Sequence, residues 1–262
     1  MPANRNEFVS TVLTLMAETV LTFEGKVPRP RLIDVNARIG HAYRYVEKSP
    51  HQALVLKVAR LTSCVTGAVT MLRVGLYQEQ GALQRIIDDT NDDIFFISIG
   101  MLRGFEPLHE RFFEAFWAEE FPDSTDTLAR HERPDFPQRK KIRAYNARMG
   151  LGENANLSLV SDVGASLASA YSGFIHGASS QIMDMYVGQP PKFHGTGQLG
   201  LGRESSQLGD AANCIYRALF SFVLVARMFE DYVLRDALHD AARRFGDVFG
   251  LNELPPHLQS RV

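Results

Sequence analysis

The feature that most constrains the fold is a helical period of apolar residues that recurs along most of the chain. In the stretch 51–78 the apolar side chains lie three or four residues apart, which places them on one face of an α-helix. The apolar residues of this stretch are Leu54, Val58, Leu61, Val65, Val69, Leu72 and Leu76. Helices are also expected at 5–24, 31–47, 81–99, 108–120, 124–131, 137–149, 157–177, 206–236 and 236–249, and a strand pattern is confined to 182–187. The sequence therefore predicts an all-α protein, a multi-helix bundle of seven or more helices.

The chain reads as one helical domain over residues 1–262. Two segments interrupt the helical pattern. The polar, proline-containing connection 121–138 resembles an insertion more than a domain boundary, and 187–204 is a loop rich in Gly and Pro.

The composition is that of a soluble globular protein, with 45% hydrophobic residues, 22% charged residues and a net charge of −2. This balance gives no general electrostatic case for nucleic acid. The longest apolar run, 218–226, is too short to span a bilayer, and the N-terminal segment lacks the pattern of a signal peptide. Cys64 and Cys214 lie inside apolar helical patterns, which indicates buried thiols in a reducing compartment. We expect a cytoplasmic protein without a membrane partner.

The segment 157–177 is expected to form a central helix because its small residues let neighbouring helices approach closely. Its last turns carry Tyr171, Ser172 and His176, and Gly177 is expected to end it. Because its charge changes near neutral pH, His176 is a candidate acid, base or phosphate contact. The alternative is a hydrogen-bonded core histidine.

The acidic run at 88–93 is the sharpest local signal. On a helix, Asp88 and Asp92 lie one turn apart, as do Asp89 and Asp93, and such carboxylates can share a hard cation such as Mg²⁺. The run resembles the DDxxD motif of the all-α prenyl-diphosphate synthases and terpene cyclases, which implies a magnesium-dependent diphosphate site on Asp88, Asp89 and Asp92. The second acidic motif of those families is not matched here. An Asp-rich helix surface balanced by a basic neighbour such as Arg85 is the alternative.

A second resemblance joins the acidic segment ALQRIIDDTNDDIFFI to the later YSGFIHGAS. Together they are similar to a loosely defined group of helical bacterial proteins related to the HEPN-like folds of toxin and phage-defence systems. The resemblance implies a helical fold, an RNA-directed or stress-associated role, and a polar cluster of Arg85, Asp89, Tyr171 and His176 as candidate catalytic residues. It implies no cofactor.

The HEPN ribonuclease motif has Arg, four to six residues, then His on one helix, and no Arg precedes His176 in this way. The spacing from Arg103 to His109 and from Arg44 to His51 fits, but Gly104, Pro107 and Pro50 are expected to interrupt these helices. Nuclease activity therefore stays open.

Three further segments carry candidate binding residues. The basic run 139–148 can contact phosphates or form the solvated face of an amphipathic helix. The GxGxxG string at 195–200 lacks the strand and helix of a dinucleotide site, so a loop is expected, with Lys192, His194 and Arg203 placed to meet an anion. Exposed aromatic side chains at 111–117 would indicate a homo-oligomer.

Three hypotheses remain open from the sequence. The first is a HEPN-like protein of bacterial stress or defence, with RNA or a protein as its partner. The second is a Mg²⁺-dependent enzyme of diphosphate substrates. The third is a non-catalytic helical interaction protein whose polar residues serve the fold.

Overall fold

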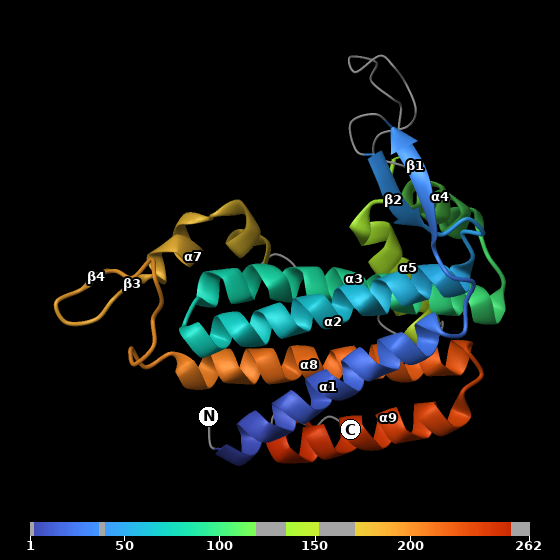
Figure 1. Ribbon diagram of the computed structural model, residues 1–262. Helices are drawn as coiled ribbons and strands as arrows, with labels where there is room; N and C mark the ends of the chain where they lie inside the picture. Colours follow the sequence, from blue (N-terminus) through green and yellow to red (C-terminus); the bar gives the residue numbers. More distant parts are fainter. Residues whose placement is uncertain (1–2, 37–39, 119–134, 152–170, 253–262) are drawn as a thin grey trace.

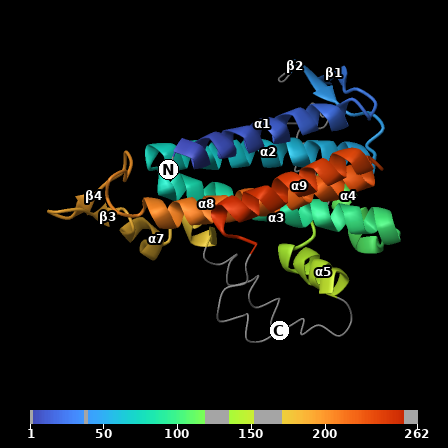
Figure 2. The same ribbon diagram turned by 90° about the horizontal axis from the view of Figure 1, so that it is seen from below.

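The computed structural model describes residues 3–36, 40–118, 135–151 and 171–252, and its architecture confirms the all-α multi-helix prediction. Five long helices run lengthwise beside one another (Figures 1 and 2). They are α1 (Ala3–Glu24), α2 (Pro50–Val74), α3 (Tyr77–Arg103), α8 (Glu204–Met228) and α9 (Tyr232–Phe249).

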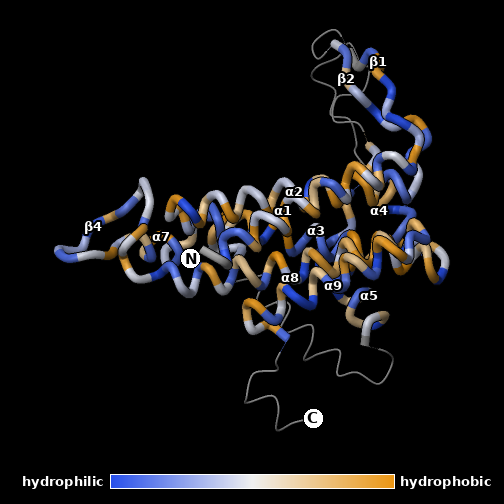
Figure 3. The backbone as a smooth tube through the Cα atoms, turned by 60° about the horizontal axis from the view of Figure 1, so that its bottom comes forward, coloured by the Kyte–Doolittle hydropathy of each residue, from blue (hydrophilic) through white to orange (hydrophobic). Residues whose placement is uncertain are grey.

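Helices α2, α3 and α8 form the centre of the bundle and contribute most of its buried apolar side chains. Figure 3 shows hydrophobic residues recurring along each long helix, as an inward-facing stripe requires. By length and composition α2 and α8 could also cross a membrane, with mean hydropathies of 1.4 and 1.3. About half of each apolar window is buried inside the bundle, 44% in α2 and 50% in α8, so core packing accounts for much of this apolar character.

The turn between α2 and α3 corrects one predicted boundary. Gly75 adopts a left-handed φ of 75° and ends α2, whereas Gly81, expected to separate two helices, lies buried inside α3. A Cβ on Gly81 would lie 2.6 Å from the ring of Phe174. This glycine therefore serves the close packing of the 171–176 helix on α3.

The helix expected at 31–47 is wrong. These residues form an antiparallel hairpin of β1 (Arg31–Asn36) and β2 (Gly40–Arg44), in which Leu32 pairs with Tyr43. Alternating β-branched residues favour the strand, and the preceding Pro28 and Pro30 favour extended backbone. Pro50 then opens α2 at its first position, where proline is well tolerated, and Ser49 forms a capping box with Gln52.

The single helix expected at 206–236 is also wrong, because it is divided into α8 and α9. Glu230 adopts a left-handed φ of 54°, and the amide of Asp231 donates to the carbonyl of Ala226 across the turn. The side chain of Asp231 then accepts from the amide of Leu234 and starts α9. An apolar helical pattern on both sides hid this break.

Shorter helices and strands lie at both ends of the bundle. Helix α4 (Pro107–Trp117) and α5 (Arg139–Leu151) lie near the end from which the hairpin projects (Figure 1). At the opposite end, α7 (Ser179–Met183), β3 (Tyr186–Val187) and β4 (Lys192–Phe193) form a projecting arm. Most of the predicted 121–138 insertion, including its helix at 124–131, and residues 157–170 of the predicted core helix lie outside the described residues.

Candidate functional site

Asp93 is the most buried member of the acidic run. Its side chain is 1% exposed and accepts from Lys57 Nζ of α2 at 2.7 Å and from the guanidinium of Arg139 of α5. Because an isolated buried carboxylate would be very costly, these two cations are what allow the charge to lie in the core.

Asp89 and Asp92 face α5 one turn apart. Arg143 bridges them, with Nη2 at 2.8 Å from Asp89 and Nε at 2.8 Å from Asp92. Arg85 adds a contact of 2.9 Å to Asp89, so the predicted pairing of Arg85 with this carboxylate is present. The side-chain amide of Asn146 donates to the backbone carbonyl of Asp92, which ties α5 to α3 a third time.

Asp88 faces α8 instead, where Arg217 Nη1 lies 2.5 Å from its carboxylate. Burial raises the pKa of Asp88, although the Arg217 guanidinium opposes this shift. Burial likewise raises the pKa of Asp92, against the hydrogen bond from Arg143. Desolvation is therefore the larger influence at both carboxyls, even though each has a cation beside it.

The acidic run forms an ionic network with its neighbours. Five cations face four carboxylates, which leaves a formal charge of +1. Mg²⁺ needs several carboxylate and water oxygens free in octahedral geometry. The carboxylates at 88, 89, 92 and 93 instead each lie within hydrogen-bond distance of a guanidinium or ammonium nitrogen, and no cluster of three His, Cys, Asp or Glu suited to a metal occurs among the described residues. This arrangement fits ion pairing between helices. The members are Lys57, Arg85, Asp88, Asp89, Asp92, Asp93, Arg139, Arg143 and Arg217.

Two members of this network were missed at the level of sequence. Lys57 and Arg217 each lie among apolar residues of a core helix. A single cation inside such a pattern is the signal that could have identified them as partners of the buried aspartates.

Tyr171 lies on the α8 side of the network. Burial raises the pKa of its hydroxyl, and the nearby Cys214, Asp210 and Asp88 act in the same direction. Burial also raises the pKa of the Cys214 thiol to about 12. The phenol and the thiol are therefore both neutral at physiological pH, as structural groups would be.

His176 does not join the other three predicted site residues. It is exposed in the last turn of the 171–176 helix, which ends as expected at Gly177 with a φ of 61°. Within the described residues it makes no hydrogen bond or ion pair. Among the described residues, its exposure differs from that of a core histidine, and no acid–base partner lies beside it.

The two Arg–His spacings do not form a nuclease pair on one helix. His109 is fully buried and stacks on Phe96 with ring centroids 4.0 Å apart. Its Nδ1 accepts from the Glu106 amide, its Nε2–H donates to the Phe96 carbonyl, and burial lowers its pKa. His51 lies at the start of α2, whereas Arg44 belongs to β2.

Helix α5 has two faces of different character. Its sequence RKKIRAYNARMGL contains five basic residues and no acidic one. Arg139 and Arg143 point into the ionic network, whereas Lys141 and Arg148 are exposed on the opposite side and Lys140 is exposed on the flank of the helix. We call these three residues the outer face of α5. Lys140 and Lys141 have no hydrogen bond or ion pair within the described part of the chain.

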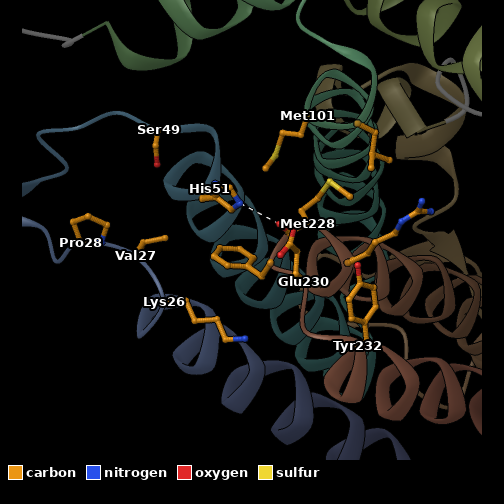
Figure 4. Close-up of a pocket in the computed structure, with 12 residues that line it drawn as sticks. Lys26, Val27, Pro28, Ser49, His51, Met101, Met228, Glu230 and Tyr232 are labelled. Atoms are coloured by element: carbon orange, nitrogen blue, oxygen red, sulfur yellow. Dashed lines mark hydrogen bonds between the residues drawn. The ribbon is translucent and has the colours of Figure 1, made fainter.

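A cavity of about 720 Å³ lies where the ends of α1, α2 and α3 meet the α8–α9 turn (Figure 4). Figure 4 shows His51 and Glu230 beside Met228 at its centre, with Lys26 and Tyr232 further along the wall. His51 Nε2 lies 3.1 Å from the Met228 carbonyl, and Lys26 is paired with Asp231 at 2.6 Å. Sequence patterns gave no signal for this cavity because its walls come from four distant segments.

The remaining sequence candidates are largely occupied by internal contacts. In the glycine-rich loop, Arg203 pairs with Asp184 at 2.7 Å and His194 Nε2 lies 3.2 Å from the Val187 carbonyl, while Lys192 is exposed. The backbone N–H of Gln198 donates to the Gly75 carbonyl. The loop therefore packs on the α2–α3 turn.

The aromatic segment 111–117 packs inward. Phe112 is fully buried, and Phe113, Phe116 and Trp117 are partly buried against the core. Homo-oligomerisation stays a prediction without support from this segment.

Comparisons of the chain with protein-family models, curated proteins and solved structures find no match. The described residues form a helical bundle in which the basic helix α5 is docked on the acidic face of α3 by a partly buried ionic network.

Proposed function

We propose that this chain is a HEPN-like, cytoplasmic RNA-binding protein of bacterial stress or defence type, and that the outer face of α5 contacts the RNA. The observation that carries the proposal is the division of α5 into an inner face neutralised by aspartates and an outer face of exposed cations, none of which has a carboxylate partner among the described residues. RNA is the partner because the HEPN-like resemblance favours it over other polyanions.

Local charge supports this proposal although the whole chain has a net charge of −2. Phosphate contacts depend on the cations that reach the strand rather than on the total. Arg103 donates to the Met149 sulfur at 3.3 Å, which adds a fourth cation beside Arg148. The inner face holds α5 to α3, so the outer cations are presented on a fixed helix.

Binding without cleavage is the function proposed. His109 is committed to core hydrogen bonds, and among the described residues His176 has no partner that would act as a general acid or base. The ion pairs of Asp88, Asp89 and Asp92 favour a structural role for the acidic run over the Mg²⁺-diphosphate alternative.

Fluorescence anisotropy with a labelled single-stranded RNA tests the proposal. We expect the full chain to bind, and Lys140→Gln/Lys141→Gln/Arg148→Gln to bind at least about tenfold more weakly. The matched control is Arg60→Gln/Arg243→Gln/Arg244→Gln, which removes three exposed cations elsewhere and should retain affinity. Absence of binding by the unmodified chain, or equal losses in both triple variants, would contradict the proposal.

The same RNA, incubated with Mg²⁺ or with EDTA and run on a gel, tests cleavage. Intact RNA is expected in both buffers. EDTA-resistant cleavage that disappears in a folded His176→Ala variant would show a ribonuclease instead. A rise in melting temperature with Mg²⁺ and diphosphate, abolished by Asp89→Asn, would support the diphosphate enzyme.

A further inference from the structure

The cavity at the α8–α9 turn contains one cation and one anion that have no partner in the described chain. Arg227 and Glu230 both line it, yet no ion pair joins them to each other or to another described residue. Lys26 and Asp231, the neighbouring pair, are already satisfied at 2.6 Å. Within the described part of the chain, the cavity therefore offers one unpaired positive group from the last turn of α8 and one unpaired negative group from the residues that follow it.

The backbone at Glu230 is a second, independent observation. This residue occupies the left-handed position that ends a helix, with a φ of 54°, where glycine is strongly favoured. A side chain costs stability at such a position, and backbone strain of this kind is concentrated at binding sites. Glutamate at this position is therefore expected to make the turn less stable than glycine would.

Apart from Lys26, which is paired with Asp231, the rest of the wall is apolar or neutral. Phe229 stacks on Phe23 with ring centroids 5.0 Å apart and meets the edge of His51 at 4.9 Å. Met101 and Met228 add adaptable apolar surface to the same cavity. A volume of about 720 Å³ falls within the range that accepts a small molecule.

From these groups we infer that the cavity binds a small zwitterion with an apolar side chain, of the class of the apolar α-amino acids. The ligand carboxylate pairs with the Arg227 guanidinium, and its ammonium group pairs with the Glu230 carboxylate. The apolar side chain lies on Phe229 and the two methionines. The His51 ring is held by its contact with the Met228 carbonyl, so that it supports the wall rather than competing for the carboxylate.

Isothermal titration calorimetry of the full chain with L-leucine, L-methionine and L-phenylalanine tests the inference. Three control compounds each lack one of the proposed contacts. Glycine lacks the apolar side chain, isovalerate lacks the ammonium group and isoamylamine lacks the carboxylate. We expect at least one of the three amino acids to bind, and each of the control compounds to bind about tenfold more weakly or worse, because each lacks one of the three contacts. Failure of all three amino acids to bind would overturn the inference, and so would equal binding of isovalerate, which would indicate a simple anion site.

Two variants separate the proposed contacts from general damage. Arg227→Gln should weaken the amino acid but leave isoamylamine unaffected, and Glu230→Gln should weaken the amino acid but leave isovalerate unaffected. Arg243→Gln, an exposed substitution on α9 away from the cavity, should change neither. Unchanged amino-acid affinity in either cavity variant would contradict the assigned roles. RNA binding is independent of these variants, so the two proposals can fail separately.

Discussion

The inner and outer faces of α5 carry the same kind of charge in opposite surroundings. Arg139 and Arg143 are partly buried and bound to carboxylates of α3, whereas Lys140, Lys141 and Arg148 are exposed and have no carboxylate partner among the described residues. A cation of the inner face stabilises the packing of α5 on α3. Its removal would leave a buried carboxylate without a partner. A cation of the outer face contributes little to folding and is free to meet an anion. We therefore expect substitutions on the inner face to change the stability of the fold and substitutions on the outer face to change RNA affinity.

The largest loss of stability is expected at Asp93, the buried carboxylate that accepts from Arg139 of the inner face. Asp93→Asn leaves Lys57 and Arg139 without their carboxylate, and we expect the free energy of unfolding to fall by about 3 kcal/mol or more. Urea denaturation measures the change. The control is Asp236→Asn, whose exposed pair with Arg235 should contribute less than about 0.5 kcal/mol. Equal effects of the two substitutions would contradict a structural role for the network.

A smaller effect is expected for Arg143→Gln, which removes the bridge between Asp89 and Asp92. We expect a loss of about 2 kcal/mol, because the two partners are partly exposed and regain water. RNA affinity should remain within about twofold, provided that the variant is folded in the assay. A large loss of RNA affinity with unchanged stability would break the division between the two faces.

Replacing Glu230 by glycine should act in the opposite direction. Glu230→Gly removes the cost of a left-handed non-glycine residue, so we expect a gain of about 1 kcal/mol in the free energy of unfolding. Thermal and urea unfolding measure it, with Glu230→Ala as the control that removes the carboxylate and keeps the strain. Loss of stability in the glycine variant would show that the Glu230 side chain serves the fold.

The smallest effect is a pH dependence of opposite sign at two carboxyls. The hydrogen bond from Lys26 holds the pKa of Asp231 below its usual value, so its contribution is complete above about pH 4 and is lost as pH falls through the folded pKa. Burial raises the pKa of Asp92, so the folded protein takes up this proton first, and stability rises as pH falls through that raised value.

Unfolding experiments from neutral pH to about pH 3.5 separate these two groups. The stability difference between the unmodified chain and Asp231→Asn should shrink toward acid. For Asp92→Asn, the free energy of unfolding of the unmodified chain should rise relative to that of the variant as the pH falls. The same direction in both variants would show that one of the pKa shifts is misassigned.

The sequence predicted the long helices well because their apolar period extends over several turns. It failed where a local backbone state decided the structure, as at the left-handed Glu230 that divides α8 from α9. It also failed at 31–47, where Leu32 pairs with Tyr43 across a hairpin and the chain does not continue as a helix. Both failures depend on contacts or dihedral angles that a helical period does not encode.

The candidate site was predictable only in part. The pairing of Arg85 with Asp89 follows from their spacing on one helix, and the structure contains it. Lys57, Arg139 and Arg217 reach the acidic run from other helices, so their roles depend on tertiary packing. The cavity around Arg227 and Glu230 is assembled from four segments, and no local pattern indicates it.

The salt dependence of RNA affinity tests whether the outer face of α5 holds the phosphates. The logarithm of the association constant should fall linearly with the logarithm of salt concentration. If the outer face of α5 makes the phosphate contacts, replacing Lys140, Lys141 and Arg148 by glutamine should reduce the steepness of this line by about 2, and Arg143→Gln should leave it unchanged. An unchanged slope in the triple variant would contradict the account, because the phosphates would then be held by another part of the molecule.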